Sequence, residues 1–446
     1  MSTKLTEEEL LAKAKKPAED AMRMHPFYRG KVQIAPKCAI RGLDDFAIWY
    51  TPGVASPCRA IHEDEGLSYE YTNRGNPIAI VSDGTRVLGL GDIGAAAGLP
   101  VMEGKALLFK YLGGVDAVPI CLDTRDAGLF IQTVKLLQPS FGGINLEDIA
   151  KPQCFHILDT LRDEMNIPVW HDDQQGTAAV TLAGLINALK VVGKDLDNVS
   201  IAMIGAGAAN VAILRLILAA GADPARVMMV DTKGILHRER DDFGCDDPRL
   251  EFSRITNVAG RRGGIAEALQ STDVCIALSR PGPDTLRAEW LKAMNQDAIL
   301  FACANPIPEI WPWEAQEAGV RIVSTGRSDF PNQVNNSLGF PGIFRGVLDV
   351  RARTISDEMA IAAAYEIALC AEEKGLDEEY IMPTMDEWDV FPREAVATAL
   401  KAQEQGLARL TRTREELYES ARHTIQQARA LLDVMVRNGM IAEMPV

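Results

Sequence analysis

The hydrophobic positions of the chain form two successive patterns of apolar runs and helix-like segments. From about residue 31 to 165, apolar runs such as PIAIVSD (77–83) and DAVPICLD (116–123) alternate with segments such as DAGLFIQTVKLL. After residue 166 the alternation is more regular, with the near-continuous apolar runs SIAMIG, RVMMVD, DVCIAL, AILFACANP and VRIVSTG. Such runs are typical of parallel strands covered by helices on both faces. The pattern predicts a two-domain α/β protein, with a smaller N-terminal α/β domain and a Rossmann-type domain built on a doubly wound parallel sheet.

Charged, helix-prone segments occupy both ends of the chain. The first contains TEEELLAKAKK and the last contains TREELYESARHTIQQARALLDVMV. The first segment cannot bury its few leucines alone, so we expect it to pack on another subunit. We therefore expect a helical arm over 1–30, a first domain over 31–165, a Rossmann-type domain over 166–385 and a helical tail over 386–446. Arm and tail together predict a homo-oligomer, either a dimer or a dimer of dimers.

Composition narrows the class of protein and its partners. A chain of 446 residues with 24% charged and 47% hydrophobic residues is typical of a globular enzyme with two large domains. Its formal net charge of −16 argues against nucleic acid and anionic membranes as partners. The eight cysteines include no C-x-x-C pair, the first residues lack the apolar core of a signal peptide, and no apolar run reaches the length of a membrane span. These features predict a cytoplasmic protein in a reducing compartment.

Two acidic pairs are the most informative polar residues. Glu147-Asp148 and Asp172-Asp173 each follow a short apolar run that is predicted to be a strand. Carboxylates crowded at strand ends repel one another unless a cation or a proton shares the site. Oxygen ligands favour the hard divalent ions Mg²⁺ and Mn²⁺. The alternative is that these acids are solvated turn residues or helix caps, which is less consistent with two such pairs followed by QQGT and an apolar helix.

Two glycine-rich segments compete as the dinucleotide-binding turn. GLGDIG (89–94) matches G-x-G-x-x-G literally, but Pro100 follows it closely and argues against a long helix there. GAGAAN (205–210) lacks the third glycine, yet it joins the strand NVSIAMI to the apolar helix VAILRLILAAG, and the next strand ends at Asp231. This is the βαβ unit in which a pyrophosphate lies at a helix N-terminus and an acid binds the ribose. GLGDIG is then a tight turn that shapes an active-site loop. The predicted dinucleotide contacts are Gly205, Gly207, Ala208, Ala209, Asn210 and Asp231, together with Asn305 from a later loop.

Other polar residues are candidates for the chemistry. Tyr50, in WYTPGVA, precedes a turn, although an isolated tyrosine is more often a packing residue. Lys105, in PVMEGKALLFK, is expected at the start of an apolar helix. There, partly desolvated and near a cation, its pKa would fall and it could act as a base. Asn305 and Asn335 follow strands of the second domain, where ligands of open α/β sheets bind, although asparagines in such loops are often turn residues.

These segments together closely resemble the malic enzymes in their short bacterial and archaeal form. The resemblance extends from about residue 31 to 352 and is carried by YTPGVA, DGTRVLGLGDIG, LPVMEGKALLFK, FGGINLEDI, HDDQQGTAAV, LINALKVVGK, GAGAAN, ANPIPEI and STGRSDFPNQVNNSLGFPGIFRG. It implies that Glu147, Asp148 and Asp173 bind Mg²⁺ or Mn²⁺. It further implies the following roles: Lys105 as the general base on the malate hydroxyl, Tyr50 as the acid that protonates enolpyruvate, Asp172 as the support of Lys105 or the metal, and Arg86, Asn305 and Asn335 as substrate contacts.

The resemblance also implies the reaction, the oxidative decarboxylation of L-malate to pyruvate and CO₂ with reduction of NAD⁺ or NADP⁺. Asp231 would repel a 2′-phosphate, but the family retains an acid here in NADP users, and Lys233, Arg238 and Arg240 follow closely. These opposing features leave only a slight preference for NAD. Two alternatives stay open: a malolactic-type lyase that forms lactate with bound NAD, and a catalytically silent dinucleotide-binding regulator.

Overall fold

The computed structural model describes residues 7–244 and 247–445. The first sheet consists of β1 (Pro77–Ser82), β2 (Asp116–Cys121), β3 (Gly143–Leu146) and β4 (Val169–His171). All three pairings in it are parallel, and the strand order is β2-β1-β3-β4. Every residue of β1, β3 and β4 is buried, as their apolar sequences require. Because β4 belongs to this sheet, the first unit extends a few residues past the expected boundary at 165.

Three helices accompany this sheet: α5 (Ala95–Gly113), α6 (Ala127–Leu137) and α7 (Gln153–Glu164). The sequence-based expectation for α5 is wrong, because the helix starts at Ala95 and contains Pro100 instead of starting at Lys105. A proline in the second turn removes one backbone donor, and the buried face of the remaining turns outweighs that loss. Lys105 therefore lies in the middle of a helix, where the dipole argument for its position does not apply.

The second sheet has the order β10-β9-β8-β5-β6-β7. Its strands are β5 (Ile201–Ile204), β6 (Val227–Asp231), β7 (Gly234–Ile235), β8 (Val274–Ala277), β9 (Ala298–Ala302) and β10 (Val320–Thr325). All pairings are parallel except β6 with β7. The strand order reverses between β5 and β8, where ligands bind in open α/β sheets. The predicted two-domain α/β fold with a Rossmann-type sheet is confirmed.

Helices α8 (Thr177–Val192), α9 (Ala208–Ala219), α10 (Pro248–Ile255), α11 (Ile265–Leu269), α12 (Ala288–Leu291) and α13 (Pro312–Glu317) accompany the second sheet. Among the described residues, the helical stretch 172–192 is long and apolar enough to cross a membrane by length and composition. However, 72% of its most apolar window is buried inside the protein, as expected for a core helix.

Four helices follow the second sheet: α14 (Phe340–Asp349), α15 (Asp357–Glu372), α16 (Val390–Glu404) and α17 (Arg414–Arg437). All ten residues of α14 are buried, and this helix packs against α5 and α16. The last helix, α17, in turn packs against α5 and α16. The C-terminal helices therefore pack against the first domain as well as against one another.

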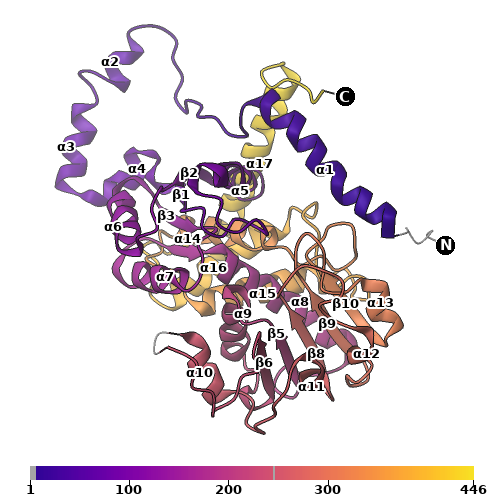
Figure 1. Ribbon diagram of the computed structural model, residues 1–446. Helices are drawn as coiled ribbons and strands as arrows, with labels where there is room; N and C mark the ends of the chain where they lie inside the picture. Colours follow the sequence, from indigo (N-terminus) through magenta and orange to yellow (C-terminus); the bar gives the residue numbers. More distant parts are fainter. Residues whose placement is uncertain (1–6, 245–246, 446) are drawn as a thin grey trace.

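The N-terminal region extends away from the body of the protein (Figure 1). Helix α1 (Glu7–Tyr28) lies near the end of α17, where the Tyr28 hydroxyl donates a 2.8 Å hydrogen bond to the Ala442 carbonyl. Helices α2 (Asp45–Trp49) and α3 (Ala55–Glu63) project on the other side and lead to α4 (Ser68–Tyr71). Large apolar side chains are exposed on this projecting segment, including Leu43 at 85% and Ile48 at 59%. Exposed apolar surface of this kind indicates a binding surface.

Candidate active site

The two acidic pairs converge at one edge of the first sheet. Glu147 and Asp148 directly follow β3, and Asp172 and Asp173 directly follow β4. Because β3 and β4 are parallel neighbours, their carboxyl ends meet at the same edge. The backbone amide of Asp148 donates a 2.8 Å hydrogen bond to Asp173 Oδ2. Asp172 opens a short π-helical turn, Asp172–Gly176, that leads directly into α8.

Lys105 extends from the middle of α5 into this carboxylate cluster. Its Nζ lies 2.6 Å from Asp172 Oδ2 and 2.9 Å from Glu147 Oε1. The ammonium also lies 4.4 Å from the centroid of the Phe340 ring, which contributes a cation–π contact. Trp170 Nε1 donates to the other oxygen of Asp172 at 3.1 Å. Asp172 thus contacts Lys105 directly, and its role as the support of Lys105 or the metal stays a prediction.

The pKa of Lys105 depends on its burial and on the carboxylates beside it. Burial alone would lower its pKa, but the charges of Asp172 and Glu147 outweigh burial and raise the pKa above its ordinary value. The predicted lowering of the pKa refers to a site with a bound cation, and it stays a prediction. Lys105 can act as a base only when its carboxylate neighbours are neutralised, as a bound cation would do.

The positive charge of Lys105 does not fully offset the burial and mutual repulsion of the carboxylates. Burial and the nearby charge of Asp173 raise the pKa of Asp148 to about 7. Burial raises the pKa of Glu147 well above its ordinary value, although Lys105 opposes the shift. Asp148 Oδ2 is buried without a hydrogen-bond partner. These oxygen donors suit Mg²⁺ or Mn²⁺. Within 7–244 and 247–445, no group of three acidic, histidine or cysteine side chains is already arranged to hold a metal ion.

Loops from both domains surround the cluster. The Arg86 amide donates a 3.0 Å hydrogen bond to the Asp148 carbonyl, and the Arg86 side chain is exposed. The loop that contains Asn335 approaches the turn that begins at Asp172, because a Cβ on Gly176 would lie 3.4 Å from the Cβ of Asn336, the residue after Asn335. Asn335 itself caps the short 3₁₀ helix Asn336–Leu338.

The second asparagine loop faces the other glycine-rich segment. The Asn305 carbonyl lies 3.7 Å from the position of a Cβ on Gly89, so residues 89–94 approach the loop that follows β9. GLGDIG thus lies between the two domains, which is consistent with a turn that shapes an active-site loop.

Tyr50 is the one predicted catalytic residue that a single chain does not bring to Lys105. It follows α2 and its side chain is 72% exposed. In Figure 1 the α2–α3 segment projects away from the body of the protein and from α5. The sequence places Tyr50 in a turn but contains no signal for this separation.

The GAGAAN turn has the features of a dinucleotide-binding turn. Gly205 follows β5 with φ 101°, and a Cβ there would lie 2.7 Å from the Leu278 carbonyl oxygen, so only glycine fits. Gly207 precedes α9 and leaves its first amides free for a phosphate. Asn210 replaces the third glycine and donates to the Ile204 and Gly205 carbonyls at 3.0 and 2.9 Å. This side chain ties the helix to the strand.

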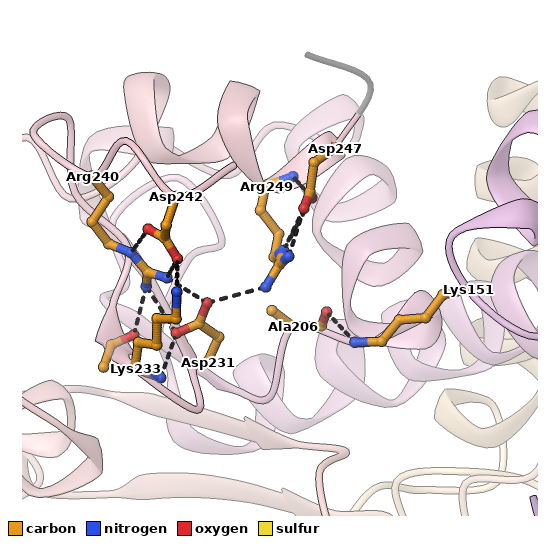
Figure 2. Close-up of polar contacts among 9 residues, drawn as sticks. Lys151, Ala206, Asp231, Lys233, Arg240, Asp242, Asp247 and Arg249 are labelled. Atoms are coloured by element: carbon orange, nitrogen blue, oxygen red, sulfur yellow. Dashed lines mark hydrogen bonds and ion pairs between the residues drawn. The ribbon is translucent and has the colours of Figure 1, made fainter. Parts of the chain in front are cut away.

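Lys151 connects the carboxylate loop to this turn. It lies three residues after Asp148, and its Nζ is 3.4 Å from the Ala206 carbonyl oxygen (Figure 2). The carboxylate loop of the first domain and the glycine turn of the second therefore adjoin each other.

Sequence reasoning missed two buried residues beside the cluster, Phe340 and Glu394. Glu394 lies on α16, is fully buried, and neither of its carboxyl oxygens has a hydrogen-bond partner. Burial, followed by the charges of Asp172 and Glu366, raises its pKa well above the ordinary value. A glutamate among the apolar positions of FPREAVATAL is the signal that could have identified it.

We expect Glu394→Gln to change the pH dependence of stability. The folded protein holds a proton on Glu394 that the unfolded chain releases near pH 4.3, so the wild type loses stability as pH rises above that value. Glutamine does not titrate. The unfolding free energy of the variant relative to wild type should therefore increase between about pH 5 and 9, as measured by denaturant unfolding. A difference that is constant across this range would contradict a protonated, buried Glu394.

Comparison with known proteins agrees with this geometry. The family described as "Malic enzyme, N-terminal domain" matches residues 29–129, and "Malic enzyme, NAD binding domain" matches 174–403. The bifunctional malic/malolactic enzyme of Bacillus subtilis (strain 168) is 48% identical over 91% of this chain and 97% of its own length. The NAD-dependent malic enzyme of Geobacillus stearothermophilus is 49% identical over 85% and 78%. Further relatives are named NADP-dependent malic enzymes.

A solved structure shares the complete fold. The crystal structure of Entamoeba histolytica malic enzyme is 49% identical, covers 100% of this chain and 94% of its own, and has a TM-score of 0.96. The family matches, the relatives and the shared fold all agree with a Rossmann-type domain that takes a nicotinamide dinucleotide. The chain belongs to the malic enzyme family.

Proposed function

We propose that this chain catalyses the oxidative decarboxylation of L-malate to pyruvate and CO₂ with reduction of a nicotinamide dinucleotide, and that it requires Mg²⁺ or Mn²⁺. The observation that carries the proposal is the buried pairing of Lys105 with Glu147 and Asp172 beside the dinucleotide domain. Once a bound cation offsets these carboxylates, a lysine in such a position can take a hydroxyl proton while the nicotinamide accepts the hydride.

The metal ligands in this proposal are Glu147, Asp148 and Asp173. Their support is their shared place at one edge of the first sheet, the unpartnered Asp148 Oδ2 and the raised pKa of Asp148. A divalent ion supplies Lewis-acid chemistry at a ketone oxygen, which favours loss of CO₂ from a β-keto acid. Arg86, Asn305 and Asn335 are proposed to contact malate, because their loops border the cluster.

We propose further that Tyr50 acts in the site of a second copy of this chain. Decarboxylation leaves an enol that needs a proton at carbon, and a tyrosine hydroxyl can donate it. Tyr50 is exposed on a segment that also exposes Leu43, Ile48 and Trp49. Burial of this segment against a partner would cover apolar surface and would also place Tyr50 in the active site of that partner. The proposed assembly is thus a homodimer or a dimer of dimers, and a cytoplasmic location stays a prediction from the sequence.

Product analysis tests the reaction. Purified protein with L-malate, Mn²⁺ and each dinucleotide should release reduced dinucleotide into solution in equal amount to pyruvate and CO₂. The Bacillus subtilis relative is named for a malolactic activity as well, so lactate must be measured alongside. Lactate without free reduced dinucleotide would contradict the proposal in favour of a malolactic lyase. No conversion of malate at all would favour a silent dinucleotide-binding protein.

A further inference from the structure

Asp231 ends β6 at the position where a βαβ dinucleotide domain binds the adenosine ribose. In this chain its carboxylate already accepts hydrogen bonds from neighbouring residues. Oδ1 accepts from Arg240 Nη1 at 2.8 Å and from the Lys233 amide at 2.9 Å. Oδ2 accepts from Arg240 Nη2 at 2.7 Å and from Arg249 Nη1 at 3.2 Å (Figure 2).

These four bonds use the hydrogen-bonding capacity of Asp231. A carboxylate offers about four acceptor positions, so none remains for a ribose hydroxyl. The side chains of Asp231 and Arg240 are only 6% and 8% exposed, and their pairing is bidentate. Burial would raise the pKa of Asp231, but hydrogen bonds from Arg240 and the Lys233 amide lower it, so the carboxylate stays charged and paired. The acid therefore anchors arginines instead of recognising the ribose.

The two arginines are also held from other sides. Arg240 bonds Asp242, and Arg249 bonds Asp247 through two of its nitrogens. Both guanidinium groups lie over the Phe243 ring, 4.5 and 5.0 Å from its centroid. These contacts fix the guanidinium groups in place beside the end of β6.

Lys233 is the most available cation of the group. Its side chain is 66% exposed, and its ammonium makes one ion pair, at 2.9 Å with Asp242. An exposed pair of this kind contributes little and can exchange for a doubly charged phosphate. Three cations, Lys233, Arg240 and Arg249, pair with the three aspartates of the group, Asp231, Asp242 and Asp247.

We propose that this pocket binds the 2′-phosphate of NADP, with Lys233 and Arg249 in contact with the phosphate and Arg240 holding Asp231 neutralised. The inference rests on the proposed function and replaces the slight preference for NAD that Asp231 suggested in the sequence. The ligand chemistry is a phosphomonoester on the adenosine ribose. An Asp231 free to accept ribose hydroxyls would have indicated the opposite preference.

Binding measurements test the pocket without turnover. The full-length protein, with Mn²⁺ and without malate, is titrated with NADPH and NADH, and bound nucleotide is followed by its fluorescence. We expect NADPH to bind at least ~10-fold more tightly, the scale of one charge-assisted hydrogen bond. Adenosine 2′,5′-bisphosphate should displace NADPH more strongly than 5′-AMP does. Equal or tighter binding of NADH would overturn the inference.

Single substitutions test which side chains contact the 2′-phosphate. Lys233→Ala and Arg249→Ala should each raise the NADPH dissociation constant by ~10-fold and change that of NADH by less than ~2-fold. Arg226→Ala is the matched control, because Arg226 lies at the other end of β6 and pairs with Asp223. It should change neither constant. Equal weakening of both nucleotides by Lys233→Ala would show a general role in folding or binding and would overturn the assignment.

The two proposals fail in distinguishable ways. Tight, selective NADPH binding without malate oxidation would refute the proposed reaction and leave the phosphate pocket standing. Malate oxidation that proceeds well with NAD⁺ and poorly with NADP⁺ would refute the pocket alone.

Discussion

A mixture of Tyr50→Phe and Lys105→Ala subunits is expected to regain about one quarter of wild-type turnover, although each variant alone has lost at least ~10²-fold. Each active site takes its lysine from one chain and its tyrosine from the other in the proposed dimer. A mixed dimer therefore has one intact site and one doubly defective site. Random exchange makes half of the dimers mixed, which gives the expected fraction. The measurement is malate-dependent turnover after co-refolding or co-expression of two differently tagged chains.

Matched substitutions separate this result from general damage. Tyr71→Phe alters another exposed tyrosine of the projecting region, and Lys110→Ala removes the next lysine of α5, which pairs with Asp116. Both should keep turnover near the wild-type value. Mixed dimers without recovered activity would show that lysine and tyrosine act within one chain. That outcome would contradict the proposed role of the projecting segment.

Asp148→Asn is expected to abolish metal-dependent turnover while stabilising the metal-free protein. Asparagine has the same shape and tolerates the left-handed backbone of this residue, φ 56°. The wild-type carboxyl has a pKa of about 7 in the folded protein, so its folded state loses stability as pH rises from about 4 to 7. In chelator at pH 8 the variant should be more stable by about 2–4 kcal/mol, and its turnover with Mn²⁺ should fall by ~10²-fold or more.

Addition of Mn²⁺ should reverse the order of stability, because an ion that binds only the folded wild type raises its unfolding free energy. Asp126→Asn is the control, since Asp126 is an exposed cap of α6 and asparagine caps equally well. It should behave as wild type in both conditions. If Mn²⁺ stabilises Asp148→Asn as much as wild type, Asp148 is not a metal ligand.

The residues that the sequence located well are those at the ends of buried strands. Apolar runs predict β3 and β4, and parallel pairing then brings Glu147, Asp148, Asp172 and Asp173 to one edge. The GAGAAN turn is likewise predictable, because strand, glycine turn and helix are contiguous in the sequence.

The remaining features depend on contacts between distant residues. The pKa of Lys105 depends on carboxylates 42 and 67 positions away in sequence, which its local helix does not reveal. The sequence predicts Asp231 as a ribose ligand, because it does not show that Arg249 donates a hydrogen bond to its carboxylate. The segment that carries Tyr50 projects away from the body of the protein, and the sequence contains no signal for that projection.

The most direct test is the absorbance at 340 nm of the chelator-treated protein with L-malate and NADP⁺ or NAD⁺. No reduction of either dinucleotide should occur until Mn²⁺ or Mg²⁺ is added, and addition should then restore a steady rate that depends on malate. A malate-dependent rate in chelator that divalent ions do not increase would contradict a metal-assisted decarboxylating site at Glu147, Asp148 and Asp173.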